Sequence, residues 1–338
     1  MRRREFLKIA PIAVTARTKC LAQKPSWLEP EYQMPTTQKG REIAEIARSI
    51  LISRDIEYVS RPERVLRLNV YLPGGLVNEL LPAIVTFTHA AWRTENRSFR
   101  HDLDHLPLAP TPDLYAPVLV PRGFAVISAD CRLASEAHFP AQIHDCKCAI
   151  RWTRANAERF HIDADRIGVM GSSASGQLAA LAAVTGPEHG LDEGTCYQGY
   201  SSKVQAAYCF AALFDFERYE HEPGDSTLRA QIQDYLGGTY QQLPERYQQA
   251  SPAHYVAPGD PPFLLMHGTE DRRVPYEQTV RFADALKQAG VPAKFVSVKN
   301  YAHSPIAGKE PDPSFDIVDA EIYRFFQEHL GAPRKPER

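Results

Sequence analysis

The sequence predicts an α/β fold whose central sheet is mostly parallel and covered by helices on both faces. From residue 83 onward, short apolar runs typical of buried strands alternate with longer segments of helical period. One apolar run ends in a cluster of Gly, Ser and Ala at 171–176, and an Ala/Leu-rich helix follows at once. In such sheets ligands bind beyond the carboxyl ends of the strands, so the functional residues are expected in the loops there.

The strands are predicted from their composition and period. Residues 65–72 alternate polar and apolar side chains, which indicates a half-buried strand, and Pro73, Gly74 and Gly75 end it. The other predicted strands are apolar runs rich in β-branched and aromatic residues, as expected of strands buried on both faces. They cover residues 83–88, 124–129, 167–170, 204–210, 263–266 and 294–298.

The helices are predicted from apolar residues that recur three or four positions apart. Such faces predict helices over 41–52, 140–160, 174–184, 276–288 and 315–330. The helix at 174–184 is apolar nearly all round, so it should be buried. Gly290 suits the C-terminal cap of the helix that precedes it. Residues 214–252 read as a mostly helical insertion that could form a small cap over a site.

Composition indicates one large globular domain. The net charge of -2 comes from mixed signs, which argues against a nucleic-acid partner. No run of about 18 apolar residues predicts a membrane span. The length allows about two domains, but folds of this class often reach it as one. We expect the α/β domain at 55–332, after a linker and N-terminal segment at 23–54.

The first 22 residues are typical of a twin-arginine export signal. Arg2 and Arg3 are followed by Phe6 and Leu7, then by a short apolar stretch at 9–16 and small residues near Ala22. We therefore expect export to the periplasm or the exterior. The alternative is a basic tail on a cytoplasmic protein.

Neither a metal nor a cofactor is expected. The six cysteines have no zinc-knuckle or disulfide-framework spacing, although one disulfide could form in an exported protein. Two histidines, His101 and His105, flank acidic residues in a loop and could suggest metal ligands. A solvated loop is the favoured interpretation, because no further cluster supports a metal.

Ser173 is the candidate nucleophile. It lies in the small-residue cluster between a strand and a helix, where a sharp turn leaves its hydroxyl exposed and places helix amides behind it. A serine hydroxyl needs a base to remove its proton and a third group to hold that base.

The base and the acid are expected in loops that follow later strands. His303 follows the strand at 294–298, and Asp271 follows the strand at 263–266. The order Ser173, Asp271, His303 is the order expected of this fold. Glu270 is adjacent to Asp271 and competes for the role of acid, whereas Asp260 precedes its strand and should lie at the opposite edge of the sheet.

Backbone amides are expected to form the oxyanion hole. One is the amide of Ala174, the residue after the nucleophile. The second is expected from Ala90 or Ala91, which follow the strand at 83–88. Each donor is typically worth about 3 kcal/mol of transition-state stabilisation.

Several blocks carry a resemblance to a known family. They are Asp130-Cys131-Arg132-Leu133, Phe139-Pro140-Ala141-Gln142, Asp165-Arg166-Ile167 with the serine turn, and Ser251-Pro252 with 261–275. The chain resembles the α/β-hydrolase superfamily and its esterase/lipase branch, and it is most similar to feruloyl and acetylxylan esterase-like (BD-FAE-like) carboxylesterases. The resemblance spans about 65–330 and implies that Asp271, the aspartate of His-Gly-x-x-Asp, is the triad acid rather than Glu270.

Three positions depart from the family pattern. Ala90 and Ala91 replace glycines of the His-Gly-Gly-Gly-Trp loop, and alanine does not adopt positive φ cheaply. Ser175 replaces the second glycine of Gly-x-Ser-x-Gly, so we expect crowding where the helix packs on the strand. Cys131 replaces a tyrosine. None of these changes removes a catalytic group.

The sequence thus predicts a serine carboxylesterase that acts through an acyl-enzyme on Ser173. The expected partner is a small-molecule or polysaccharide ester, and the resemblance favours acetyl or feruloyl esters. The alternatives are a non-catalytic ligand-binding member of the fold, motivated by the altered glycines, and a peptidase of the same fold.

Overall fold

The computed structural model describes residues 50–75, 79–87, 89–95, 116, 118–192, 196–222 and 224–335. The predicted export signal at 1–22, the linker that follows it and the His101–His105 cluster lie outside the described residues. The interpretations of these three segments therefore stay predictions from the sequence.

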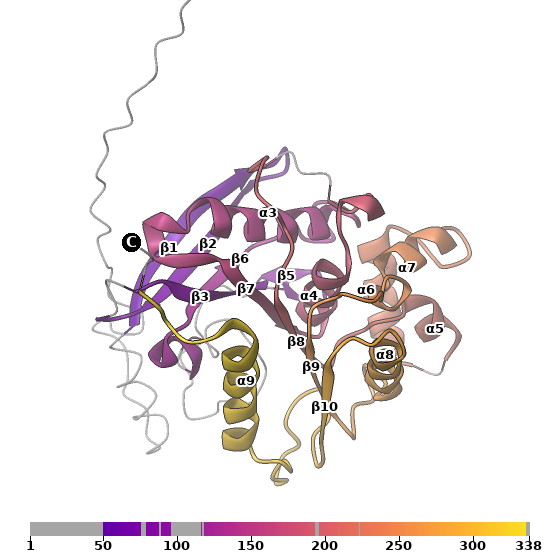
Figure 1. The fold of residues 1–338 in the computed structure, drawn as a ribbon. Helices are drawn as coiled ribbons and strands as arrows, with labels where there is room; N and C mark the ends of the chain where they lie inside the picture. The colour runs from indigo at the N-terminus through magenta and orange to yellow at the C-terminus, as the bar shows by residue number, and fades with distance from the viewer. Residues whose placement is uncertain are drawn as a thin grey trace, which may run out of the picture.

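A sheet of eight strands, in the order β1-β2-β6-β3-β7-β8-β9-β10, forms the centre of the molecule (Figure 1). The strands from β6 to β10 along this order are joined by parallel ladders, whereas β2 runs antiparallel to both β1 and β6. The strands are β1 (Ile50–Ser60), β2 (Val65–Pro73), β3 (Leu81–Phe87), β6 (Ala125–Ala129), β7 (Ile162–Ser172), β8 (Ala206–Phe210), β9 (Phe263–Gly268) and β10 (Ala293–Val298). The predicted mostly parallel sheet is therefore confirmed.

Strand β1 differs from the sequence prediction. It begins at Ile50, so residues 50–52 are extended rather than the end of a helix over 41–52, and the sheet starts before the predicted boundary at 55. The ladder with β2 shifts register between Ser53 and Ile56, where Asp55 has a positive φ of 53°. Such a bulge interrupts the alternation of side chains, which is the signal by which a half-buried strand is found.

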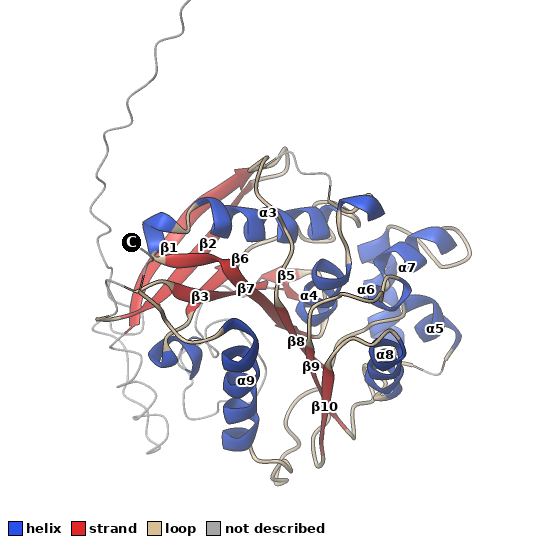
Figure 2. Ribbon diagram, in the orientation of Figure 1, coloured by secondary structure: helices blue, strands red, loops and turns tan. Residues whose placement is uncertain are grey.

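Alternate residues of the parallel strands point to opposite faces, and each face carries its own core. On β3, for example, Val85 packs into one cluster with helices α3 (Ala141–Ala155) and α4 (Ala174–Val184), and Ile84 packs into the other with helix α9 (Phe315–Leu330). Helices therefore cover both faces, as Figure 2 shows in blue on either side of the red sheet.

Most helices follow the predicted pattern. They are α3 (Ala141–Ala155), α4 (Ala174–Val184), α5 (Phe216–His221), α6 (Ser226–Leu236), α7 (Pro244–Ala250), α8 (Glu277–Gln288) and α9 (Phe315–Leu330). Shorter elements are the strands β4 (His89–Ala90) and β5 (Thr94–Glu95) and the 3-10 turns η3 (Val120–Arg122), η4 (Glu158–Phe160), η5 (Pro187–His189) and η6 (Pro252–His254). Helices α4 and α9 have the bounds that the sequence predicts.

Helices α5, α6 and α7 form the insertion expected at 214–252, between β8 and β9. They lie together at one end of the sheet (Figure 1). Tyr235 of α6 stacks on the ring of Trp92 at a centroid distance of 4.5 Å. The insertion therefore packs against the loop that follows β3. Within the described ranges, the structure holds no helix both long and apolar enough to cross a bilayer.

The cysteines among the described residues lie on the α3 face of the sheet. Cys148 is disulfide-bonded to Cys196, a pairing that the sequence left open. Cys146, two residues away on α3, instead contacts Cys131 with a sulfur-sulfur distance of 3.4 Å. The two helix cysteines therefore point in different directions, as expected for positions two apart.

Lys147 is fully buried between α3 and the end of α4. Its ammonium donates a hydrogen bond of 2.5 Å to the carbonyl of Thr185. Burial, together with the nearby charge of Arg151, lowers the pKa of Lys147 to about 7, although Glu188 acts in the opposite direction. The folded protein thus holds this proton more weakly than the unfolded chain does.

We expect Lys147→Met to stabilise the protein most at pH 6–7, with the gain shrinking as pH rises towards 10. The unfolded chain binds the lysine proton up to its ordinary pKa near 10.4, so the contribution of Lys147 to the free energy of unfolding becomes less unfavourable by about 1.4 kcal/mol per pH unit between about pH 7 and pH 10. Urea unfolding of both proteins at several pH values measures the difference. The exposed Lys287→Met serves as control, and an equal gain for Lys147→Met at pH 6 and pH 10 would contradict the prediction.

Candidate active site

Ser173 lies at the turn between β7 and α4 and has φ 52° and ψ -123°, a conformation disfavoured for residues with a Cβ. A Cβ at Gly171 would overlap the backbone of Ser175, so only glycine fits there. The Ser173 amide donates to the carbonyl of Phe210 at 2.9 Å, which ties the turn to β8. The glycine predicted at 171 is therefore required by close backbone contact.

His303 follows β10 and lies beside Ser173, as predicted. Its Nε2 is 3.0 Å from Ser173 Oγ, and its Nδ1 is 2.7 Å from Asp271 Oδ2. A carboxylate accepts hydrogen bonds, so Nδ1 carries the proton and Nε2 presents its lone pair to the serine hydroxyl. Residues from three separate loops thus meet in a serine-histidine-aspartate arrangement.

Asp271 is held at both carboxylate oxygens. Oδ1 accepts the amides of Arg273 at 2.9 Å and Val274 at 3.0 Å, while Oδ2 faces His303 and a second histidine, His267, at 3.2 Å. Burial would raise the pKa of Asp271, but the hydrogen bonds to His267 and His303 outweigh it and lower that pKa well below its ordinary value. The carboxylate therefore stays charged in a buried setting.

The two competing acids are placed elsewhere. Glu270 is exposed and forms an ion pair with Lys309 at 2.8 Å. Asp260 precedes β9 and accepts the amide of Ala257 at 2.9 Å. Of the acids considered from the sequence, Asp271 is the one that contacts His303.

His267 is a residue of the site to which the sequence analysis gave no role. It is completely buried at the end of β9, four residues before Asp271. Its Nε2 faces two acceptors, Asp271 Oδ2 and the carbonyl of Val274, so Nε2 is the donor. Its Nδ1 is 2.6 Å from the hydroxyl of Thr279 on α8. The sequence signal that could have identified His267 is its place as the histidine of the His-Gly-x-x-Asp motif, directly before Gly268.

The predicted oxyanion donors belong to α4 and to the loop that follows β3. Ala174 is the first residue of α4, directly after Ser173. Ala91 has φ 51° and Trp92 has φ 56°, so this loop takes up the left-handed conformation without glycine. Such strain costs of the order of 1–3 kcal/mol per residue and persists only where the surroundings hold it. That Ala90 and Ala91 aim their amides at Ser173 stays a prediction.

The crowding expected at Ser175 is wrong. Its side chain is buried, and its hydroxyl donates a hydrogen bond of 2.7 Å to the carbonyl of Phe87, the last residue of β3. The hydroxyl of Ser175 therefore forms a hydrogen bond with β3 instead of crowding it.

Residues 68–286, more than half of the chain, match the sequence profile of the BD-FAE family. The chain belongs to the BD-FAE family. Ser173 and Asp271 lie inside the matched residues, and His303 lies beyond them.

Named relatives and solved structures agree with this assignment. Esterase LipC of Mycobacterium tuberculosis is 33% identical over 206 residues, which are 60% of this chain and 47% of LipC. A truncated carbohydrate esterase from gut microbiota is 27% identical with a TM-score of 0.67, covering 82% of this chain and 96% of that one. Est2, an esterase from Thermogutta terrifontis, is 25% identical with a TM-score of 0.64, covering 82% and 92%. The fold of this BD-FAE member is therefore the α/β-hydrolase fold.

The chain spans about half the length of the curated relatives that it matches, 47% of LipC and 49% of esterase LipQ.

Proposed function

We propose that this BD-FAE family member is a serine carboxylesterase that works through an acyl-enzyme on Ser173. The observation that carries the proposal is the chain of contacts from Ser173 Oγ to His303 and from His303 to Asp271. These are the three groups that convert a weakly nucleophilic hydroxyl into an attacking one.

In the acylation step, Ser173 Oγ attacks the ester carbonyl carbon while His303 Nε2 takes the hydroxyl proton. The carbonyl π electrons move to oxygen, and the amide of Ala174 with that of Ala90 or Ala91 stabilises the charge. The carbon-oxygen bond to the alcohol then breaks, and His303 returns the proton to the leaving alcohol. The acyl group remains esterified to Ser173.

In the deacylation step, water replaces the alcohol. His303 Nε2 takes a proton from water, the resulting hydroxide attacks the acyl carbon, and the proton returns to Ser173 Oγ as the acid leaves. Asp271 keeps its charge throughout and stabilises the imidazolium that forms twice in each cycle.

The comparisons support an ester substrate. LipC carries the name esterase, and another Est2 structure, 25% identical with a TM-score of 0.64, is described as butyrate-bound. The direct test is covalent labelling of Ser173 by a fluorophosphonate probe, with hydrolysis of p-nitrophenyl acetate measured on the same sample. A folded protein that neither labels nor hydrolyses would favour the ligand-binding alternative.

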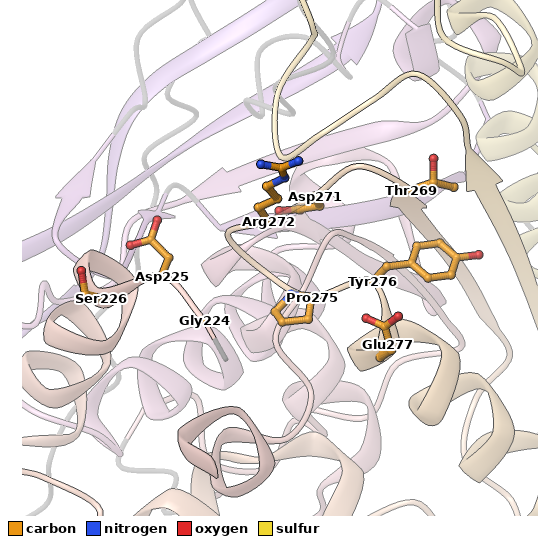
Figure 3. Close-up of a pocket in the computed structure, with 9 residues that line it drawn as sticks. All are labelled: Gly224, Asp225, Ser226, Thr269, Asp271, Arg272, Pro275, Tyr276 and Glu277. Atoms are coloured by element: carbon orange, nitrogen blue, oxygen red, sulfur yellow. The ribbon is translucent and has the colours of Figure 1, made fainter. Parts of the chain in front are cut away.

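We propose further that the alcohol part of the ester is a polyhydroxylated group such as a sugar. An open pocket of about 630 Å³ lies beside the Asp271 loop. Figure 3 shows that it lies between the start of α6, with Asp225 and Ser226, and the start of α8, with Glu277. Most of its lining side chains are polar, which suits hydroxyl groups better than an acyl chain. The solved structure described as a carbohydrate esterase points in the same direction.

Arg272 lies in the loop after β9 and Glu277 is the first residue of α8, and both are exposed on this pocket. We expect the double variant Arg272→Ala/Glu277→Ala to lower the ratio of kcat/KM for acetylated xylo-oligosaccharide to that for p-nitrophenyl acetate by about tenfold, which corresponds to about 1.4 kcal/mol. Acetate release and p-nitrophenol release give the two rates. Arg324→Ala, on α9, is the control, and an unchanged ratio in the double variant would remove the pocket from the alcohol side.

A further inference from the structure

The loop that follows β3 is tied at both ends to the helix that follows Ser173. At its start, the hydroxyl of Ser175 donates to the carbonyl of Phe87 at 2.7 Å. At its end, Nε1 of Trp92 donates to Oε1 of Gln177 at 3.0 Å. Ser175 and Gln177 both lie in the first turn of α4, and both hydrogen bonds are buried. We call these two bonds the loop clamp.

The Gln177 end of the clamp has a fixed orientation. The carboxamide Nε2 donates to the carbonyl of Ala250, at the end of α7, with a distance of 2.8 Å. A carbonyl only accepts and an indole N–H only donates, so these two partners leave one arrangement of the Gln177 amide. The Trp92 ring is held in turn by stacking on Tyr235, with an angle of 8° between the planes.

The backbone conformation between the two clamped ends of the loop has to be supported by contacts with neighbouring elements. Ala91 and Trp92 both have positive φ, which neither residue type adopts readily. Without glycine, the left-handed turn depends on contacts that hold it from outside. The clamp supplies contacts of this kind on either side of Ala90 and Ala91.

We propose that Ser175 and Gln177 are positioning residues that set the distance between the two halves of the oxyanion hole. Ala174, Ser175 and Gln177 belong to one rigid helical turn. The Ala174 amide and both ends of the loop that follows β3 are therefore held by the same helix. Serine at 175 thus contributes a bond that a glycine could not make. This proposal rests on the esterase function and deepens it.

The test uses Ser175→Ala, which removes the bond to Phe87 and keeps the Cβ, and Trp92→Phe, which removes the bond to Gln177 together with one of the two indole rings. We expect kcat for p-nitrophenyl acetate to fall about 10- to 100-fold in each variant with KM nearly unchanged, since the loop acts on the transition state. The double variant should lose less than the product of the two, because either release frees the same loop. Hydrogen exchange of the amides at 89–92 should become faster in both.

Thr153→Val is the matched control. Its buried hydroxyl donates to the carbonyl of Ala149 at 2.9 Å on α3, so it loses a similar bond away from the site. We expect it to lose stability and to retain kcat and slow exchange at 89–92. A kcat within twofold of wild type in both clamp variants would overturn the proposal, as would unchanged exchange of the loop.

Hydrogen exchange of the amides at 89–92 also distinguishes a failure of this proposal from a failure of the proposed function. A wild-type protein that hydrolyses no ester would contradict the esterase function, and the exchange comparison alone would then decide whether the clamp holds the loop. An active wild type with equally active clamp variants would contradict the positioning role alone.

Discussion

Ser173→Ala is expected to lower kcat for p-nitrophenyl acetate on the order of 10⁵-fold. The hydroxyl oxygen forms the acyl-enzyme, and nothing else in the described part of the site offers an oxygen hydrogen-bonded to His303 Nε2. Alanine keeps the Cβ at φ 52°, so the turn between β7 and α4 should retain its backbone. The residual rate would come from the oxyanion donors and from binding.

The neighbouring Ser172→Ala provides the comparison, because Ser172 is the last residue of β7 and precedes the turn. We expect it to keep kcat within a few-fold. Initial rates and the midpoint of thermal unfolding should be measured on the same preparations. Equal rates for wild type and Ser173→Ala would mean that hydrolysis proceeds elsewhere, and the acyl-enzyme mechanism would be rejected.

Asp271→Asn is expected to lower kcat by about 10³- to 10⁴-fold while the protein stays folded. Oδ1 accepts two backbone amides, so the asparagine oxygen would take that position and its NH₂ would take the position of Oδ2. The NH₂ would then donate to His303 Nδ1 and leave the proton on Nε2. A protonated Nε2 cannot accept the proton of Ser173 Oγ.

Glu270→Gln is the matched control for this change, since it removes the same charge one residue away. Glu270 is paired with Lys309 at the surface, so we expect kcat within about twofold of wild type. Comparable losses in both variants would mean that net charge near the loop matters rather than the tautomer of His303. The lowered pKa of Asp271 keeps this carboxylate charged at mildly acidic pH, so titration of Asp271 should not limit activity there.

Much of the fold could be predicted because its local signals agree with one another. Helix α9 has an apolar face of helical period and α4 is apolar nearly all round, and both were predicted with their observed bounds. Strand β1 was not, because the bulge at Asp55 breaks the period of two. The disulfide between Cys148 and Cys196 joins positions 48 residues apart, and no spacing rule identifies such a pair.

The candidate site, too, was predictable from the sequence only in part. The amino-acid sequence by itself identified Ser173 and His303 and restricted the acid to Glu270 or Asp271, because these residues follow predicted strands and parallel strands bring such loops to one edge of the sheet. The family resemblance then selected Asp271. Only the tertiary structure decided how these groups are supported. The contact of His267 with Asp271 and the bond from Ser175 to Phe87, 88 residues away in the chain, depend on where packed elements meet. Local patterns specify which elements form, whereas contacts between distant elements are set by packing alone.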